Sequence, residues 1–173
     1  MLSVIIECFD QESELAQTLT TLVAGAVQGI VADVVVLDNG SSDGTSKLAD
    51  AAGCRFYVHW DLRDVLANAR GEWVLLVEPG ARPTQGWIDE IAEYIALNQK
   101  PARFSPSRYH RRPLFKRLGR RGPPLEQGFL LPKHQALSIA TTGMKLVDLV
   151  AGLKGHALSS EMVPAWAARP ARA

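Results

Sequence analysis

The stretch VVVLDNGSSDGT, residues 34–45, decides the fold class. Its first four residues form an apolar, largely β-branched run, which is typical of a strand buried on both faces. The polar residues that follow form a dense turn signal, and Ser42 or Asp43 is placed to cap a helix after the turn. Because a buried strand runs through a turn into a helix, the stretch predicts one unit of a parallel α/β sheet.

The same alternation extends on both sides of this unit. Residues 2–6, 55–60 and 73–77 predict three more strands. Helical spacing predicts helices at residues 15–27 behind an Asp10 cap, at 45–52 before Gly53, at 64–69, and at 87–95 behind a Thr84 cap. The pattern indicates a mostly parallel sheet with helices on both faces and right-handed crossovers. Ligands of such sheets bind beyond the carboxyl ends of the strands, so the loops starting at Glu7, Asp38 and Glu78 are the candidate site.

The second part of the chain differs in composition. Residues 101–126 contain five prolines, and the segment 103–121 holds eight Lys or Arg and no acid, which predicts a basic loop with one helical turn at 114–118. A strand is predicted at 128–131 and a helix at 134–155. We expect a single domain over 1–173, with a nucleotide-sugar half (1–100), an acceptor-side half (101–163) and a disordered tail (164–173).

Composition restricts the class of protein. The 173 residues are 47% hydrophobic and 21% charged, and they contain neither a spanning apolar stretch nor a basic leader, so we expect a cytoplasmic, globular protein with Cys8 as a buried, reduced thiol. The net charge of +1 hides an asymmetry, because residues 1–100 carry −9 and residues 101–173 carry +10. The halves then face different partners or each other, as in a homo-oligomer. The positive excess is local, which argues against nucleic-acid binding.

Asp38 stands where a ligand of such a sheet is expected. A carboxylate at the end of a buried parallel strand is placed to accept a hydrogen bond from an N–H on the edge of a nucleobase. An Asp before a Gly/Ser turn also braces its own turn by accepting from the backbone. Spacing alone favours the brace.

Three blocks of the chain resemble family 2 glycosyltransferases, which have the GT-A, Rossmann-like fold. These are SVII (3–6), DNGSSDGT (38–45) and ARGEWVLLV (69–77), with a weaker similarity at PLEQGFLL (124–131) to the small bacterial members. The resemblance implies transfer of a sugar from a nucleoside diphosphate donor, most often UDP, to a glycan or a lipid precursor of the cell envelope. Such a protein would work in the cytoplasm or at the inner membrane face.

The resemblance also assigns residues to the donor. It implies that Asp38 accepts from the base and that Phe9 takes the place of a stacking Tyr. The other implied nucleotide contacts are Asn39, Asp64 to the ribose or base, and Glu78 to the ribose. A divalent cation, Mn²⁺ or Mg²⁺, would neutralise the diphosphate, with Glu78 as a contact through water.

Two departures from the family pattern bear on activity. Gly80 replaces the metal-binding Asp, and Lys145-Leu146 occupies the position of the catalytic base, for which Glu126 is the remaining candidate. Arg82 is placed to supply charge instead of a metal, and Arg111 and Arg112 to bind phosphate, an acidic acceptor or an anionic membrane surface. Two functions stay open: an active glycosyltransferase, or a catalytically inactive relative that senses nucleotides or binds another protein.

Overall fold

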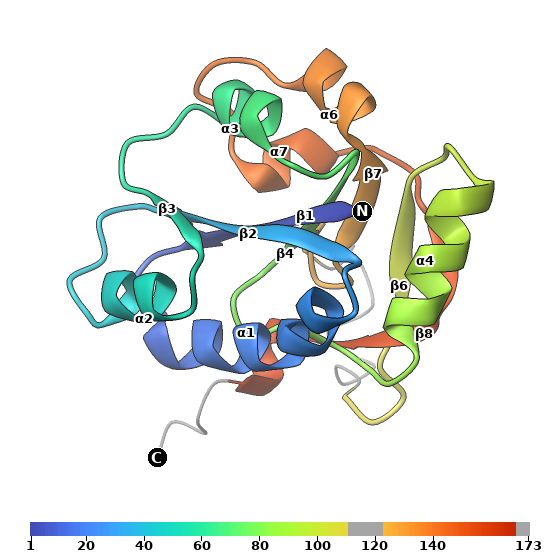
Figure 1. Cartoon of the computed structure of the whole chain (residues 1–173), viewed down its shortest axis with the longest axis horizontal. Coiled ribbons are helices and arrows are strands. Elements are labelled where there is room, and N and C mark those ends of the chain that lie inside the picture. The colour runs from blue at the N-terminus through green and yellow to red at the C-terminus, as the bar shows by residue number, and fades with distance from the viewer. Residues whose placement is uncertain (111–122, 169–173) are drawn as a thin grey trace.

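The computed structural model describes residues 1–110 and 123–168. Strands and helices alternate through its first part, as the sequence predicts (Figure 1). These elements are β1 (Leu2–Cys8), α1 (Glu12–Val27), β2 (Val31–Asp38), α2 (Thr45–Ala51), β3 (Arg55–Tyr57), α3 (Leu62–Asn68) and β4 (Trp73–Val77). The pairs β1·β2, β1·β4 and β2·β3 are all parallel, which confirms the predicted unit.

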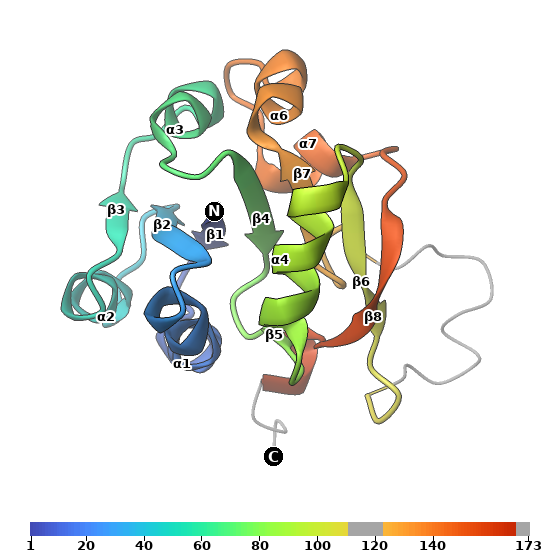
Figure 2. The ribbon, with the colours of Figure 1, turned by 45° about the vertical axis from the view of Figure 1, so that its right-hand side comes forward.

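The later elements extend the sheet on the other side of β4. They are β5 (Arg82–Pro83), α4 (Trp87–Leu97), β6 (Ala102–Pro106), β7 (Phe129–Pro132), α6 (Lys133–Ile139), α7 (Leu146–Val150), β8 (His156–Val163) and the 3-10 helix η1 (Ala165–Ala168). The eight strands form one sheet in the order β3-β2-β1-β4-β7-β6-β8-β5. β7 is antiparallel to β4 and β6, whereas β6 and β8 run parallel, side by side in Figure 2. In the described residues, no helix is long and apolar enough to cross a membrane.

In the second half of the chain, the structure differs from several predictions. The segment predicted to be a basic loop begins with strand β6, while its predicted helical turn at 114–118 lies outside the described residues. The helix predicted at 134–155 is two helices, α6 and α7, because the chain turns between them at Gly143, where φ is +76°. The tail predicted to be disordered from residue 164 starts with η1, and residues 169–173 lie outside the described residues.

Helix starts also differ from the predicted caps. Gln11, not Asp10, precedes α1 and makes no side-chain cap, and Asp10 has a φ of +48°. Gly86 precedes α4, while the Thr84 hydroxyl accepts a hydrogen bond from the Glu161 N–H at 3.1 Å. Thr84 therefore joins the start of α4 to β8 rather than capping the helix.

The sheet is covered on both faces, as the uniformly apolar strands predict. Alternate strand residues, such as Ile6 and Val77, pack with α1 and α4 in one buried cluster. Their neighbours, such as Ile5 and Leu76, pack with α3, α6 and α7 in a second cluster. Figure 1 shows α3, α6 and α7 on one side of the central strands and α1 and α2 on the other.

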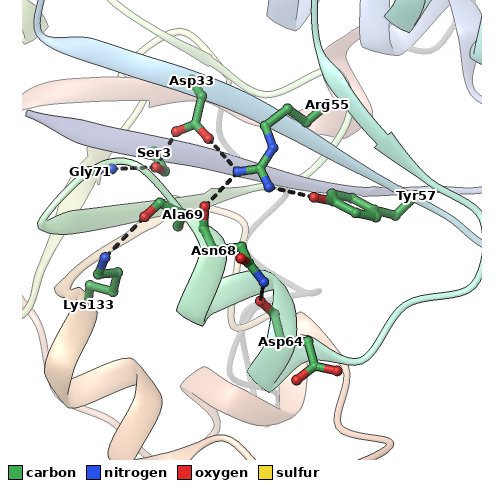
Figure 3. A network of polar contacts seen from close by, with 9 residues as sticks. All are labelled: Ser3, Asp33, Arg55, Tyr57, Asp64, Asn68, Ala69, Gly71 and Lys133. Atoms are coloured by element: carbon green, nitrogen blue, oxygen red, sulfur yellow. Dashed lines mark hydrogen bonds and ion pairs between the residues drawn. The ribbon is translucent and has the colours of Figure 1, made fainter.

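A polar network joins the amino ends of the central strands, at the edge opposite the candidate site (Figure 3). The Arg55 guanidinium lies 3.0 Å from the Asp33 carboxylate and donates to the Asn68 carbonyl at 2.7 Å. The Ser3 hydroxyl donates to Asp33 and accepts from the Gly71 N–H at 2.9 Å. Burial acts to lower the pKa of Arg55, but its hydrogen bonds and the charge of Asp33 outweigh burial and raise that pKa. The network fixes β1, β2, β3 and the start of β4 relative to one another.

Candidate functional site

A cavity of about 340 Å³ opens at the carboxyl ends of β1, β2 and β4. Glu7, Asn39 and Glu78 lie in its wall, so the three loops singled out from the sequence all reach it. Another part of the wall is formed by Lys145 and Leu146 at the start of α7. The position expected from a parallel sheet is therefore the position observed.

Phe9 supplies an aromatic surface to this cavity. Its side chain lines the cavity and is 56% exposed, which is unusual for a Phe that packs into a core. Glu78 is half-buried in the wall, with its backbone carbonyl accepting from the Ala81 N–H at 3.0 Å. Asn39 is exposed, and its amide donates to a Glu7 carboxylate oxygen at 2.9 Å.

Asp38 braces its own turn. One carboxylate oxygen accepts from the N–H groups of Gly40 and Ser41, both at 3.0 Å, and the other accepts from the Ser41 hydroxyl at 2.5 Å. The residue is only 3% exposed and lies behind the wall of the cavity rather than in it. These bonds hold the turn after β2 in one conformation, which places the neighbouring Asn39 in the cavity wall.

Acidic side chains join the β1–α1 loop to the turn before α2. The Asp10 carboxylate accepts from the Ser42 N–H at 2.6 Å, and the Asp43 carboxylate accepts from the Glu12 N–H at 3.0 Å. Asp43 also accepts from the Thr45 hydroxyl, and that bond is the main cause of its lowered pKa. Asp10, predicted to cap α1, therefore serves the neighbouring turn.

Glu7 connects the end of β1 to the start of α7. One carboxylate oxygen accepts from Asn39, and the other accepts from the Leu146 N–H at 3.2 Å. The Lys145 ammonium lies 3.9 Å from the same carboxylate, with 61% of the lysine side chain exposed. Lys145 and Leu146 thus lie in the cavity wall, where the resemblance expects the base, and neither supplies the carboxylate that this role requires.

Gly80 does not line the cavity, and the space beside it is filled. A Cβ at this residue would lie 2.9 Å from both the Ala165 oxygen and the Ala168 Cβ, so η1 occupies the space that a side chain would need. The described residues contain no cluster of three His, Cys, Asp or Glu side chains able to hold a metal ion. The position that the resemblance assigns to the metal ligand therefore offers no carboxylate, and Glu7 and Glu78 are the acidic side chains in the described part of the wall.

The remaining predicted site residues lie apart from the cavity wall. Arg82 in β5 donates to Gln17 of α1, and Asp64 is exposed on α3 (Figure 3). Glu126 accepts from the Trp166 indole N–H at 2.9 Å. None of these three side chains lines the cavity. Arg111 and Arg112 lie outside the described residues. In the described part of the basic segment, Arg108 pairs with Glu161 at 2.7 Å.

The sequence did not reveal Lys145 as a cation of the cavity. Its position was recognised only as that of a missing base, and its contact with Glu7 spans most of the chain. Ala165 in the wall was missed as well, because the Ala- and Arg-rich tail carries no periodic apolar signal. Cys8 behaves as predicted: it is unpaired and buried, and burial, with the charge of Asp38, raises its pKa to about 12.

Solved structures share this architecture. Glucosyl-3-phosphoglycerate synthase from Mycobacterium tuberculosis with uridine diphosphate matches with a TM-score of 0.56 and 20% identity, covering 79% of this chain and 58% of that one. The same enzyme with Mn²⁺, UDP-glucose and phosphoglyceric acid gives 0.57 and 19%, covering 79% and 57%. A mycobacterial protein gives 0.60 and 22%, covering 80% and 55%. The chain thus spans less than two thirds of each of these proteins, and identities this low establish the fold alone.

The sheet, its helices and the cavity at its carboxyl edge define a protein with the GT-A fold of glycosyltransferases. The family model described as Glycosyl transferase family 2 matches residues 3–121. The chain belongs to this family. No curated protein sequence matches it.

Proposed function

We propose that the chain binds a nucleoside diphosphate sugar in the cavity at the carboxyl ends of β1, β2 and β4. The observation that carries the proposal is the cavity itself, whose volume of about 340 Å³ lies within the range of small-molecule sites. Its exposed Phe9 offers a face on which a nucleobase stacks. UDP is the first nucleotide to test, because two of the solved structures that share this fold contain UDP or UDP-glucose.

In this proposal Asp38 and Asn39 contact the base. The Asp38 carboxylate already accepts three hydrogen bonds, and a carboxylate has about four acceptor sites. A base N–H takes the fourth, on a group that its own turn holds in place. Asn39, which is exposed in the wall, keeps one amide N–H on Glu7 and offers its second N–H and its carbonyl oxygen to the base or ribose.

The wall of the cavity favours binding without transfer over a fully active transferase. A transferase of this family would pass the sugar to a glycan or a lipid precursor of the cell envelope. That step needs a base for the acceptor hydroxyl, and Lys145 and Leu146 occupy the corresponding part of the wall. Glu126 lies outside the wall and accepts from Trp166. A nucleotide-sensing or protein-binding role is therefore the favoured candidate, and sugar transfer is the second.

Calorimetric titration with UDP, GDP, CDP and dTDP, each with and without Mn²⁺, tests the proposal. We expect one nucleotide to bind, and Phe9→Ala to weaken its affinity by about tenfold, since base stacking contributes about 1–3 kcal/mol. Tyr109→Ala is the matched control, because Tyr109 is another exposed aromatic residue, 92% exposed, that does not line the cavity. If none of the four nucleotides binds, the proposal is wrong.

Release of free nucleotide separates the two candidates. A bound UDP-sugar that is consumed in the presence of an acceptor would establish transfer. A bound UDP-sugar that stays intact over many hours would support the sensing role. Glu126→Gln is the informative variant, because loss of turnover with unchanged nucleotide affinity would assign that carboxylate as the base.

A further inference from the structure

A diphosphate needs a positive partner in this cavity. It carries at least two negative charges at neutral pH, and two carboxylates, Glu7 and Glu78, already lie in the wall. Bringing a third anionic group beside them without a counter-charge is unfavourable. Lys145 is the cation that the described part of the wall contributes. We propose that Lys145 binds the diphosphate and takes the place of a divalent cation, an inference that rests on the proposed nucleotide binding.

The lysine is held by its backbone while its side chain stays adjustable. The Lys145 N–H donates to the Asp148 carboxylate at 3.1 Å, at the first turn of α7. Its ammonium lies 3.9 Å from the Glu7 carboxylate, and the side chain is 61% exposed. An ion pair this long and this exposed is weak, so the ammonium turns towards a phosphate at small cost.

Glu7 keeps its hydrogen bonds when Lys145 moves. The Asn39 amide and the Leu146 N–H each donate to the Glu7 carboxylate, at 2.9 and 3.2 Å. Loss of an ion-pair partner is strongly unfavourable when the remaining charge is buried without any hydrogen bond. Glu7 avoids this, because its carboxylate keeps both of these donors. Glu7 instead competes with an incoming anion for the ammonium and holds it beside the cavity.

Arg82, the cation that the sequence suggested for this role, does not reach the cavity. Its guanidinium donates to Gln17, and it lies in β5, where it is paired with Val163 of β8. A divalent cation is the other possible counter-charge, but Gly80 cannot be its ligand, and η1 fills the space that a ligand side chain at this position would need. Lys145 is the cationic side chain in the described part of the wall.

Calorimetry with UDP and with uridine, in buffer containing EDTA, tests this role. Lys145→Gln is expected to weaken UDP binding by about tenfold or more, the loss typical of a charged hydrogen bond, and to leave uridine binding unchanged. Lys145→Arg is expected to retain UDP binding. Glu7→Gln is expected to strengthen UDP binding several-fold, because the amide still accepts from Leu146 but no longer competes for the ammonium. Lys154→Gln, at an exposed lysine outside the cavity, is the matched control.

The outcomes separate this inference from the proposed function. If wild-type protein binds neither UDP nor uridine, the nucleotide site itself is refuted, and the role of Lys145 with it. If UDP binds in EDTA but Lys145→Gln binds it equally well, only the role of Lys145 is refuted. The role of Lys145 is also refuted if UDP binds only with Mn²⁺ and Lys145→Gln binds UDP with unchanged affinity under that condition. Opposite shifts in Lys145→Gln and Glu7→Gln would establish the inference.

Discussion

Gly80 packs against Ala165, so closely that a Cβ on the glycine would lie 2.9 Å from the alanine carbonyl oxygen. The backbone of Gly80 also has a φ of +96°, which side chains other than glycine rarely adopt. Its N–H donates to the buried Thr18 hydroxyl at 2.8 Å. The loop after β4 is therefore closed over by the segment that follows β8.

Gly80→Ala is expected to destabilise the protein, because it combines backbone strain with a clash against η1. The strain alone amounts to about 1–3 kcal/mol, and the clash adds to it. Denaturant unfolding measures the loss. Gly143→Ala is the control for strain, since φ there is +76° and no atom lies within 4 Å of the added Cβ. Equal losses in the two variants would show that η1 does not crowd residue 80.

Gly80→Asp tests the same contact with a metal as the readout. Because the new carboxylate would point at η1 rather than into the cavity, we expect destabilisation and no gain in Mn²⁺ affinity. Titration with Mn²⁺ in the presence of UDP measures this. A variant that folds normally and acquires Mn²⁺-dependent UDP binding would contradict the structure at this point.

Glu7→Ala is expected to loosen the start of α7. It removes the acceptor of the Leu146 N–H and of the Asn39 amide, and the loss of a charged acceptor costs about 1–3 kcal/mol. Hydrogen exchange should accelerate at Leu146, and denaturant unfolding should give the change in stability. Glu72→Ala, at an exposed carboxylate before β4, should change neither quantity.

Arg55→Met is expected to destabilise the sheet without affecting ligand binding. It leaves the Asp33 carboxylate, whose side chain is only 4% exposed, without its charged partner. We expect a loss of about 2–3 kcal/mol in the free energy of unfolding. The loss is smaller than for a fully buried ion pair, because the Arg55 side chain is 27% exposed. The network lies at the edge opposite the cavity, so the UDP affinity of the folded protein should stay constant. Arg63→Met removes an exposed arginine as the control.

Glu90 predicts a pH dependence of stability. Burial acts to raise its pKa, but hydrogen bonds from Ser160 and Ser159 outweigh burial and leave the pKa below its ordinary 4.5. The ionised form therefore stabilises the fold fully above pH 4.5, and this contribution is lost as the pH falls through the lower, folded-state pKa. Glu90→Gln should destabilise by about 1 kcal/mol at pH 7 and progressively less below pH 4.5. Unfolding curves across this range, with Glu93→Gln as control, measure the effect.

The parallel part of the fold was readable from the sequence because its central strands β1, β2 and β4 contain long apolar runs that end at strong turn signals. Strand β8 was not, since its inward positions are interrupted: Leu158 and Met162 are buried, but Ser160 between them is only half-buried and bonds to Glu90. The split between α6 and α7 was signalled by Gly143, but the apolar residues on both sides of it predicted a continuous helix. Hydrophobic periodicity does not predict the secondary structure of a segment whose inward-facing positions include both apolar and polar residues.

The candidate site was predictable in position but not in composition. The strand ends located Glu7, Asn39 and Glu78, because parallel strands bring their carboxyl ends to one edge. The pairing of Glu7 with Leu146 joins residues 139 positions apart, and it depends on how α7 returns to the sheet. Residue spacing in the sequence does not predict such a contact. Only the structure shows that Lys145, and not Arg82, is the cation in the cavity wall.

The two outermost strands have a consequence for how copies of the chain meet. β3 is three residues long, and β5 is two, of which Pro83 has no N–H to donate. Each border of the sheet therefore offers few free backbone groups to an incoming strand, and borders of this kind protect proteins from fibril-like stacking. A dimer of this chain would have to be held by side chains on helices and loops, and its formation would then respond to salt rather than to backbone pairing.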